Sequence, residues 1–419
     1  MSLLESQNGP GHVSSLKGTP LVARPHAVAE AAPTTTELTD RAQIVAAIAA
    51  KHAPAVDRAA RFPEEAMRSA KELRLLGMLV PTELGGDGAS TSDAVDVCYI
   101  LGRACGSTGL IFAMHQMMVA CLVRHGLNSS WHRRFAQRIH SEQLLLASST
   151  TEGKGGGDLR KSECAVEQDG IAIALTKSAT VMSYGAQADA VVTTARRSTD
   201  APASDQVLVA FSKDDYRVEQ IAGWDTLGMR GTCSAGFNFE GTGKMDQVLP
   251  EPYQRIHAHT GMPVAHLTWS AVWAGVATGA VDRARAFVRS AARGSSGQLP
   301  PGAAHLTRAT ASLRTLRAVI TSALERYEAV NNDVGELESL DFQTGMNLLK
   351  VTASELAIAT VSSAMQASGL AGYRNDGEFS VTRHLRDAMS SSVMINNDRI
   401  LANVGTASLL VEPPAFLTK

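Results

Sequence analysis

Apolar residues recur along the first part of the chain with the spacing of a helix. Ile44, Val45 and Ile48 form an i, i+4 stripe that follows a Thr-Asp cap. A second helix is expected to begin at Pro63-Glu64-Glu65, because carboxylates in a first turn oppose the helix dipole. Residues 92–125 are apolar on most faces, which predicts further helices that are buried.

The pattern changes between about residues 145 and 245, where apolar runs are short and interrupted by glycine. Ile171, Ile173 and Leu175 alternate with smaller residues, and residues 207–211 form a continuous apolar run. Alternation and short apolar runs between turn residues are typical of β-strands. This part of the chain is therefore predicted to be β-rich.

The helical pattern returns after about residue 260 and continues to the end. Residues 264–292 are mostly apolar and contain no proline, and a Gly/Ser/Pro-rich break separates them from a predicted helix over residues 303–330. A further long helix is predicted for residues 343–368, and the last helices for about residues 380–410.

These patterns predict an α+β fold with a helical N-terminal domain, a middle β-barrel-like domain and a C-terminal four-helix bundle. The expected ranges of the three domains are 36–145, 146–255 and 256–419. Residues 1–35 are rich in Ser, Gly, Pro, His and Ala and lack periodicity, which predicts a disordered tail.

Composition adds little beyond the constraints of an ordinary globular protein. The chain has 419 residues, of which 44% are hydrophobic and 19% are charged. A formal net charge of −2 gives no reason to expect a nucleic acid or an anionic membrane as partner. No unbroken apolar run reaches the roughly 20 residues that span a bilayer, so no membrane segment is expected.

The five cysteines are widely spaced and form no CxxC or Cys/His cluster. This usage fits a reducing compartment and argues against a disulfide scaffold or a structural zinc site. The N-terminus also lacks the basic start and apolar stretch of a secretory signal. We therefore expect a cytoplasmic protein without a metal site.

Short motifs at the joints between the three parts are more specific than composition. They are Leu76–Gly88 (LGMLVPTELGGDG), Thr151–Asp158 (TEGKGGGD), Ser183–Asp189 (SYGAQAD) and Leu227–Thr232 (LGMRGT). Three more follow in the C-terminal part: Arg293 with Gly297, residues 366–373 (QASGLAGY) and residues 383–388 (RHLRDA). In this order, from about residue 60 to about residue 400, they resemble the signature segments of the acyl-CoA dehydrogenase family.

The resemblance implies FAD as cofactor, an acyl thioester of CoA or of a carrier protein as substrate, an electron-transfer flavoprotein as electron acceptor, and a homodimer or homotetramer. The family has hydroxyl groups on the flavin ring where Thr151 and Ser183 stand here, and an arginine that reaches the FAD pyrophosphate across a subunit interface where Arg293 stands. Taken singly, the same residues are also typical of turn hydroxyls and of a cation at a helix C-terminus. The matching positions further suggest cofactor contacts at Gln366, Gly369 and Asn397 and substrate contacts at Gly157, Thr268 and Asn396.

Two other groups of residues have both a structural and a functional interpretation. His115 with its neighbours Met114, Met117 and Met118 is predicted to lie in the core of a buried helix, with the wall of an acyl pocket as the alternative. Trp224 is expected either near the flavin or as a packed core indole.

The catalytic base of the family has no counterpart where it is expected. In most members a glutamate in a Y-E-G-T segment, shortly after R-D-A, removes the α-proton of the thioester. An ungapped reading from Arg386-Asp387-Ala388 puts Ile395 at this glutamate, and isoleucine cannot accept a proton. Some members carry the base before a V-x-A-G segment, and that position is Thr268 here.

Three explanations remain open. Either the register shifts by a few residues and Asp398 is the base, or His266, the nearest titratable side chain, replaces it. The third explanation is that the enzyme does not desaturate, because the same fold hosts flavin monooxygenases that combine reduced flavin with O₂ and need no carboxylate there. Val181 stands where the family commonly has an aromatic residue, which either opens space beside the flavin for O₂ or a bulkier substrate or is a neutral change in packing.

The sequence therefore predicts an FAD-dependent oxidoreductase that oxidises an acyl thioester with a non-standard base. The alternative is a two-component monooxygenase that takes reduced FMN or FAD as cosubstrate from a flavin reductase. A third hypothesis is a catalytically idle family member that binds a thioester or a partner protein.

Overall fold

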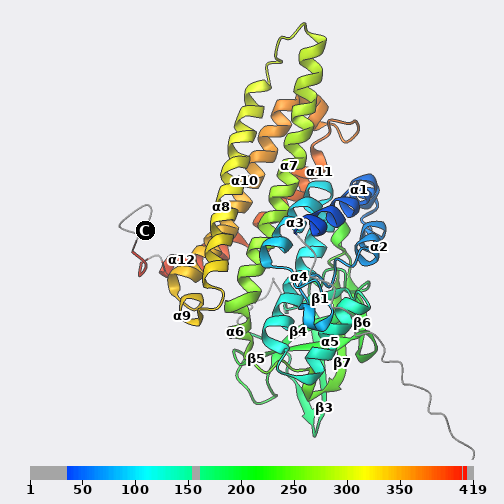
Figure 1. Cartoon of the computed structure of the whole chain (residues 1–419), viewed down its shortest axis with the longest axis vertical. Coiled ribbons are helices and arrows are strands. Elements are labelled where there is room, and N and C mark those ends of the chain that lie inside the picture. Colours follow the sequence, from blue (N-terminus) through cyan, green and yellow to red (C-terminus); the bar gives the residue numbers. More distant parts are fainter. Residues whose placement is uncertain (1–34, 153–160, 408, 413–419) are drawn as a thin grey trace, which may run out of the picture. The chain divides into compact units, whose positions relative to one another are not determined.

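Helices make up the first part of the chain, as the sequence predicts (Figure 1). The computed structural model describes residues 35–152, 161–407 and 409–412, so the tail predicted for residues 1–35 lies outside the described residues except for Thr35. The N-terminal helices are α1 (Thr35–Ala59), α2 (Glu64–Glu72), α3 (Thr91–Ala104), α4 (Gly106–Gly126) and α5 (Ser130–Ser141).

Local sequence signals start and end these helices. Ser90 caps α3, because its hydroxyl accepts the backbone N–H of Asp93 at 3.1 Å while the Asp93 carboxylate accepts the backbone N–H of Ser90 at 2.8 Å. α2 begins at Glu64, as predicted. It ends at Glu72, two residues before Arg74, which adopts a left-handed backbone with φ of 55° that a right-handed helix cannot continue through.

The middle part contains two separate sheets. β1 (Leu146–Ser149), β4 (Ala190–Arg196) and β5 (Gln206–Ser212) form the first in the order β1-β4-β5, and β2 (Glu167–Asp169), β3 (Ala172–Ala179), β7 (Gly236–Lys244) and β6 (Tyr216–Ala222) form the second in the order β2-β3-β7-β6. Both are open in the part of the chain described, so the barrel-like expectation is corrected to two open sheets. β4 and β5 are buried almost throughout, which explains why residues 207–211 of β5 form a continuous apolar run.

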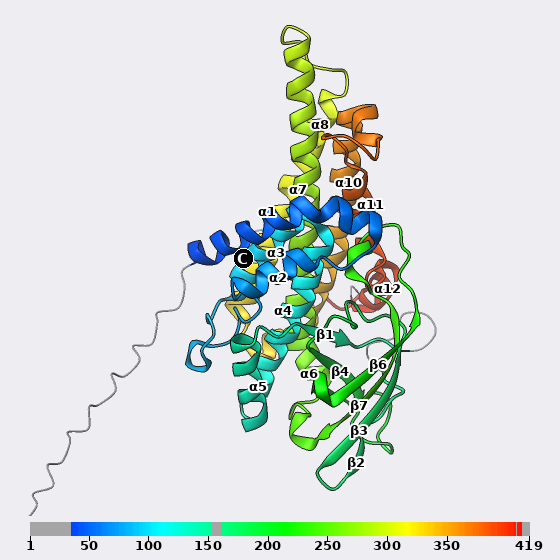
Figure 2. The same cartoon turned by 90° about the vertical axis from the view of Figure 1, so that its right-hand side faces the viewer.

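A bundle of long helices forms the C-terminal part and confirms the predicted order of helical, β-rich and helical parts. Its elements are α6 (Tyr253–Ile256), a π-helical turn (His257–Gly261), α7 (Met262–Gly294), α8 (Ala303–Val330), α9 (Val334–Leu337), α10 (Leu340–Tyr373), α11 (Thr382–Met389) and α12 (Asn397–Ala407). α7 packs against α10, α3 and α8. Both views show the sheets towards the start of α7 and the turn into α8 at its other end (Figures 1 and 2).

α3 and α7 cross at a distance that only glycine allows. A Cβ added at Gly275 would lie 2.3 Å from the carbonyl oxygen of Tyr99, and one added at Gly102 would lie 2.5 Å from the carbonyl oxygen of Val272. Both obstacles are backbone atoms, which cannot move aside as a side chain does. This close contact fixes α7 against α3. The site described below lies at the start of α7.

Three helical stretches are long and apolar enough to cross a membrane by length and composition: Gly106–Gly126, Tyr253–Gly294 and Leu340–Tyr373. The expectation of no membrane segment was drawn from unbroken apolar runs, whereas these stretches are apolar on average and include single polar residues. The most apolar windows of the first two stretches are 89% and 94% buried inside the protein, which is typical of core helices.

Candidate active site

A cavity of about 640 Å³ lies where α4, the start of α7, the β part and α11 meet. Two chain segments, 224–234 and 386–395, contribute to its wall. These segments contact each other. The backbone N–H of Met229 donates to the carboxylate of Asp387 at 2.7 Å, and a Cβ added at Gly228 would lie 2.0 Å from the carbonyl oxygen of Arg386. Cavities of about 300–1,000 Å³ are typical of small-molecule and cofactor sites.

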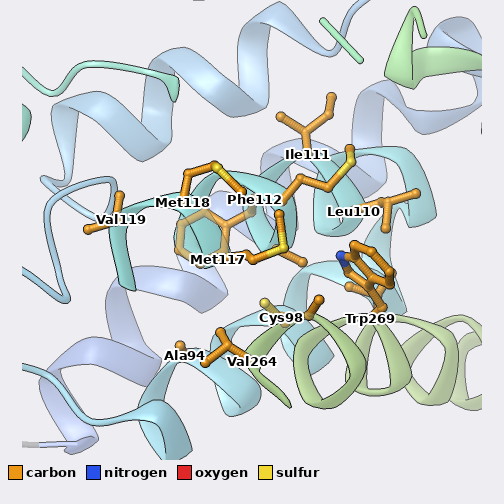
Figure 3. Packing of buried hydrophobic residues seen from close by; sticks show 14 of the residues in the cluster. Ala94, Cys98, Leu110, Ile111, Phe112, Met117, Met118, Val119, Val264 and Trp269 are labelled. Carbon is orange, nitrogen blue, oxygen red and sulfur yellow. The ribbon is translucent and has the colours of Figure 1, made fainter. Parts of the chain in front are cut away.

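Most of the cavity wall is apolar, and methionine is its most frequent residue. Figure 3 shows Leu110 and Met117 of α4 beside Trp269 of α7, and all three border the cavity. Thioether side chains are flexible and polarizable, so this wall adapts to bulky ligands and contacts aromatic rings well. Seven of the 14 methionines in the chain belong to the wall: Met114, Met117, Met118, Met229, Met262, Met389 and Met394.

A one-way chain of hydroxyl groups ends at the cavity. Each hydroxyl has one hydrogen, and Thr232 donates its own to the carbonyl oxygen of Met229 at 2.9 Å. Thr232 can therefore only accept from Ser234 at 2.8 Å, so Ser234 in turn accepts from Ser183 at 2.7 Å. The oxygen of Ser183, which borders the cavity, is left as an acceptor for an N–H group of a ligand.

Three further residues named from the sequence border the same cavity. Thr151 donates its hydroxyl to the carbonyl oxygen of Val181 at 3.0 Å, and both residues belong to the wall. Trp224 also lies in the wall, with its indole N–H donated to the carbonyl oxygen of Met229 at 3.1 Å. Gly157 lies outside the described residues.

His266 is a buried imidazole of the wall, and its protonation can be assigned. Its side-chain Nδ1 is 2.9 Å from the carbonyl oxygen of Met346 on α10. A carbonyl only accepts, so Nδ1 carries the proton and Nε2 is the unprotonated nitrogen. Burial lowers the pKa of His266 to about 3, so the ring stays neutral. Nε2 has no hydrogen-bond partner within the described ranges and is the acceptor that this ring offers to a ligand.

Ile395, where the family's glutamate was expected, also borders the cavity. Its backbone φ is 48°, a left-handed conformation that costs a β-branched residue roughly 1–3 kcal/mol. Its carbonyl oxygen accepts a hydrogen bond from Lys350 Nζ at 2.5 Å. The backbone therefore holds the Ile395 side chain at the cavity wall. This side chain has no titratable group and cannot act as a base.

Carboxylates are absent from this wall as far as the chain is described. Its titratable residues are Cys121, Tyr253, His257, His266 and Arg386. Burial raises the pKa of the Cys121 thiol to about 12, which leaves it protonated. The described residues also contain no group of three or more His, Cys, Asp or Glu side chains placed to hold a metal ion.

Seven of the predicted site residues that the structure describes do not border the cavity: Thr268, Asn396, Asn397, Asp398, Arg293, Gln366 and Gly369. Thr268 is buried and donates its hydroxyl to a carbonyl oxygen of its own helix at 2.7 Å. Asp398 is exposed on α12, and the side-chain oxygen of Asn396 accepts its backbone N–H at 2.7 Å. Asn397 is buried, and its side-chain oxygen accepts from Lys350 at 2.7 Å.

Arg293, Gln366 and Gly369 lie at the other end of the bundle and are exposed. Arg293 stands in the last turn of α7, about 27 residues beyond His266, which is roughly 40 Å at 1.5 Å per residue. Gly369 interrupts α10 with φ of 54° and ψ of −138°. None of these side chains can reach the cavity of its own chain, so any contact with a ligand there would come from another copy.

The sequence analysis missed Lys350 and the segment 389–394, which contributes five residues to the wall. A lysine inside an apolar stretch of α10, between Leu349 and Val351, was a visible signal for the first. The segment itself carries no pattern that places it at a cavity, because its path depends on contacts with residues far away in the sequence.

Comparisons with known proteins agree with this architecture. The family model “Acyl-CoA dehydrogenase, N-terminal domain” matches residues 35–143, and “Acyl-CoA dehydrogenase, C-terminal domain” matches residues 257–409. Probable acyl-CoA dehydrogenase FadE25 of Mycobacterium tuberculosis is 24% identical over 368 residues, covering 86% of this chain and 91% of that protein. A dibenzothiophene monooxygenase of Rhodococcus erythropolis is 26% identical over 346 residues, covering 80% of each.

A solved structure has the same fold. FMN-bound TdsC from Paenibacillus sp. A11-2 superposes with a TM-score of 0.79 at 20% identity, covering 90% of this chain and 98% of that one. The two ranges matched by the family models together make up more than half of the chain and flank the β part that closes the cavity. The chain therefore belongs to the acyl-CoA dehydrogenase family of flavin-dependent enzymes.

Proposed function

We propose that this chain is a flavin-dependent monooxygenase that uses reduced flavin and O₂ to oxygenate an uncharged, bulky apolar substrate. The observation that carries the proposal is a cavity wall without Asp or Glu among the described residues. Desaturation of a thioester needs a group that removes the α-proton, whereas oxygenation does not need a carboxylate there. The proposal therefore follows the alternative drawn from the sequence rather than thioester oxidation.

The composition of the wall supports an uncharged substrate. Its charged side chain is Arg386, whose guanidinium is already engaged by the carboxylate of Asp57 and by the carbonyl oxygen of Leu227 at 3.1 Å. A charged substrate group placed among the methionines would lose its hydration without gaining a partner, which is costly. A flat apolar molecule instead gains dispersion and sulfur–aromatic contacts.

His266 has a role in this reaction that fits its protonation. With Nδ1–H donated to Met346, its Nε2 accepts a hydrogen bond from an O–H or N–H group and so orients the substrate. Reduced flavin, when bound, supplies the two electrons with which O₂ gives one oxygen atom to the substrate and the other to water. The imidazole stays neutral throughout, because burial holds its pKa near 3.

The residues of the cavity fit a flavin ring. Ser183 offers a hydroxyl acceptor for a ring N–H, while Thr151 and Trp224 border the same space. Arg293 and Gln366, which are exposed at the far end of the bundle, would hold the remainder of the cofactor from a second copy, so we expect a homodimer or homotetramer. A flavin reductase is the redox partner that this reaction requires, and we expect both proteins in the cytoplasm, where the five unpaired cysteines of this chain stay reduced.

The relatives divide between the two reactions. Dibenzothiophene monooxygenase and FMN-bound TdsC favour oxygenation, and FadE25 favours dehydrogenation. Because all three are below 30% identity, the cavity itself has to decide.

Thioester dehydrogenation remains the second candidate on one observation. His266 presents an unprotonated Nε2 in the wall and, with the second imidazole of the wall, His257, is able to take an α-proton there. A pKa near 3 makes His266 a weak base, since general bases work best with a pKa close to the operating pH. This reaction would therefore be slow.

Anaerobic mixing with a panel of acyl-CoAs separates the two candidates. The protein is loaded with oxidised flavin, and the flavin absorbance is followed after each addition. We expect no bleaching with any chain length, because no carboxylate is available to remove the α-proton. Bleaching by any acyl-CoA would overturn the proposal in favour of dehydrogenation. An idle family member would neither bleach nor give oxygenated product when reduced flavin and O₂ are supplied.

A further inference from the structure

Lys350 of α10 is completely buried and donates all its hydrogens to one segment of the cavity wall. Its Nζ lies 2.7 Å from the carbonyl oxygen of Ser391, 2.5 Å from that of Ile395 and 2.7 Å from the side-chain oxygen of Asn397. An ammonium has three N–H groups, so the three acceptors use its full capacity. One side chain thus binds three points of the segment 391–397.

These acceptors are all neutral. Among the described residues no carboxylate forms an ion pair with Lys350, and the nearest compensation is the ring of Trp273, whose centroid is 5.6 Å from Nζ. A buried cation without a counterion is expensive, and burial lowers the pKa of Lys350 to about 7. An apolar residue would fill this position at lower cost, so the lysine points to a requirement for the three hydrogen bonds.

Apart from Lys350, the segment is held by short-range hydrogen bonds of Ser390 and Ser391 and by the packing of Met394 and Ile395 against the core. Ile395 adopts φ of 48°, which a β-branched residue reaches only when its surroundings enforce it. Beyond Ile395, the Asn397 side chain donates a hydrogen bond to Ser354 Oγ at 2.9 Å. Ser354 lies on α10 one turn after Lys350, so this bond attaches the end of the segment to the same helix. Val393 is 68% exposed, so packing does not restrain this residue.

The same face of α10 also orients His266. Met346, whose carbonyl oxygen accepts from His266 Nδ1, stands four residues before Lys350 and therefore one turn away on the same side of the helix. α10 thus fixes two parts of the cavity wall at once: the imidazole through Met346 and the wall at Ile395 through Lys350. The positive charge of Lys350 also contributes to the low pKa of His266.

We propose that Lys350 is a positioning residue that determines which substrates fit, because its three hydrogen bonds hold the segment 391–397 as a wall of the cavity. Without them the left-handed turn at Ile395 relaxes, and the side chains of Met394 and Ile395 move relative to His266. The part of this inference that concerns substrates rests on the proposed function, whereas the part that concerns the wall does not.

Hydrogen exchange tests the wall directly and needs no bound ligand. In Lys350→Met, which keeps the length of the side chain and removes the donors, amide exchange of a peptide spanning residues 389–400 should accelerate about tenfold or more. Peptides from α3 should exchange as in the wild type. Lys51→Met, at an exposed lysine of α1, is the matched control and should leave all peptides unchanged. Wild-type exchange over residues 389–400 in Lys350→Met would overturn the inference.

A second variant covers the case in which Lys350→Met does not fold. Asn397→Ala removes one of the three acceptors and should accelerate exchange of the same peptide to a smaller extent. Histidine NMR adds an independent readout, because loss of the charge in Lys350→Met should raise the pKa of His266. An unchanged exchange rate in Asn397→Ala would also count against the inference.

A substrate panel then separates this inference from the proposed function. If both hold, Lys350→Met changes the ranking of kcat/KM among uncharged aromatic substrates, mainly through KM. Faster exchange at residues 389–400 with no oxygenation by either protein would remove the proposed function and keep Lys350 as the residue that holds the wall. Oxygenation together with an unchanged exchange rate and an unchanged ranking of substrates would keep the proposed function and remove the role of Lys350.

Discussion

Adjacent residues of α4 have different tasks, and helix geometry explains the division. Met114, Met117 and Met118 are spaced i, i+3, i+4 and share the face that borders the cavity. His115, one residue after Met114, points to a different face of α4. Its Nε2 lies 2.8 Å from the carbonyl oxygen of Leu76, and its Nδ1 accepts the backbone N–H of Leu146 at 3.0 Å. The sequence offered core and pocket as alternatives for the four together, and spacing alone would have separated them.

His115 should make the protein sensitive to acid. The hydrogen bond that Nδ1 accepts from Leu146 requires a neutral ring, and burial lowers the pKa of His115 to about 4. The unfolded chain therefore binds a proton that the folded protein does not, so its contribution to stability is complete above about pH 6.5 and is lost as the pH falls towards 4. For one such group the free energy of unfolding drops by up to about 1.4 kcal/mol per pH unit in this window.

Urea unfolding of the wild type and of His115→Gln between pH 7 and 4 measures this contribution. The substitution should cost stability at neutral pH, and the difference between the two proteins should shrink as the pH falls. Parallel curves would show that His115 does not titrate in this range.

Ile395→Glu tests whether this position corresponds to the base of the family. The change puts a carboxylate into an apolar cavity, where burial raises its pKa and makes it a usable base. Slow bleaching of the flavin by an acyl-CoA should then appear. Asn396→Glu, at an exposed neighbour that does not border the cavity, is the control and should give none. Identical absorbance traces for the two variants would contradict the correspondence.

At the scale of elements, the close crossing of α3 and α7 supports the start of α7. Gly275→Ala should lower the free energy of unfolding by roughly 2–3 kcal/mol, because the new Cβ meets backbone atoms of α3. Gly405→Ala is the matched control, since Gly405 lies in α12 with nothing within 4 Å of an added Cβ. There alanine should be neutral or stabilise by up to about 1 kcal/mol. Equal melting temperatures of the two variants would show that the helices can move apart.

The sequence predicted those elements whose limits are set locally. α8 occupies residues 303–330, as predicted from the helical pattern and the break before it, and the apolar run at residues 207–211 lies within β5. The division of the strands into two sheets could not be predicted, because it depends on pairings between distant segments. The same holds for the site: Ser183 and Ile395 were named from motifs, whereas the hydrogen bond between Lys350 and Ile395 joins positions 45 residues apart that no local pattern connects.

At the scale of the whole molecule, the distance between Arg293 and the cavity requires a second copy if Arg293 contacts the cofactor. Arg293→Ala should then weaken flavin binding about tenfold or more, the equivalent of one charge-assisted hydrogen bond. Arg289→Ala, one turn earlier on α7 and also exposed, is the matched control and should bind flavin normally. Flavin titrations at several protein concentrations provide the measurement.

Flavin affinity should also depend on the protein concentration. Dilution below the dissociation constant of the oligomer should reduce flavin affinity in the wild type, because each site would lose the arginine of its neighbour. A flavin affinity that depends neither on Arg293 nor on protein concentration would place the entire cofactor within one chain.

Isotopic labelling of the product shows directly whether the cavity supports oxygen transfer. The protein is supplied with reduced flavin by a flavin reductase under isotopically heavy O₂, together with a panel of uncharged aromatic compounds, and the products are identified by mass spectrometry. A monooxygenase should give a product that carries one heavy oxygen atom and that is absent without the reductase. No labelled product from any compound, together with bleaching of the oxidised flavin by an acyl-CoA, would contradict the proposed oxygenation.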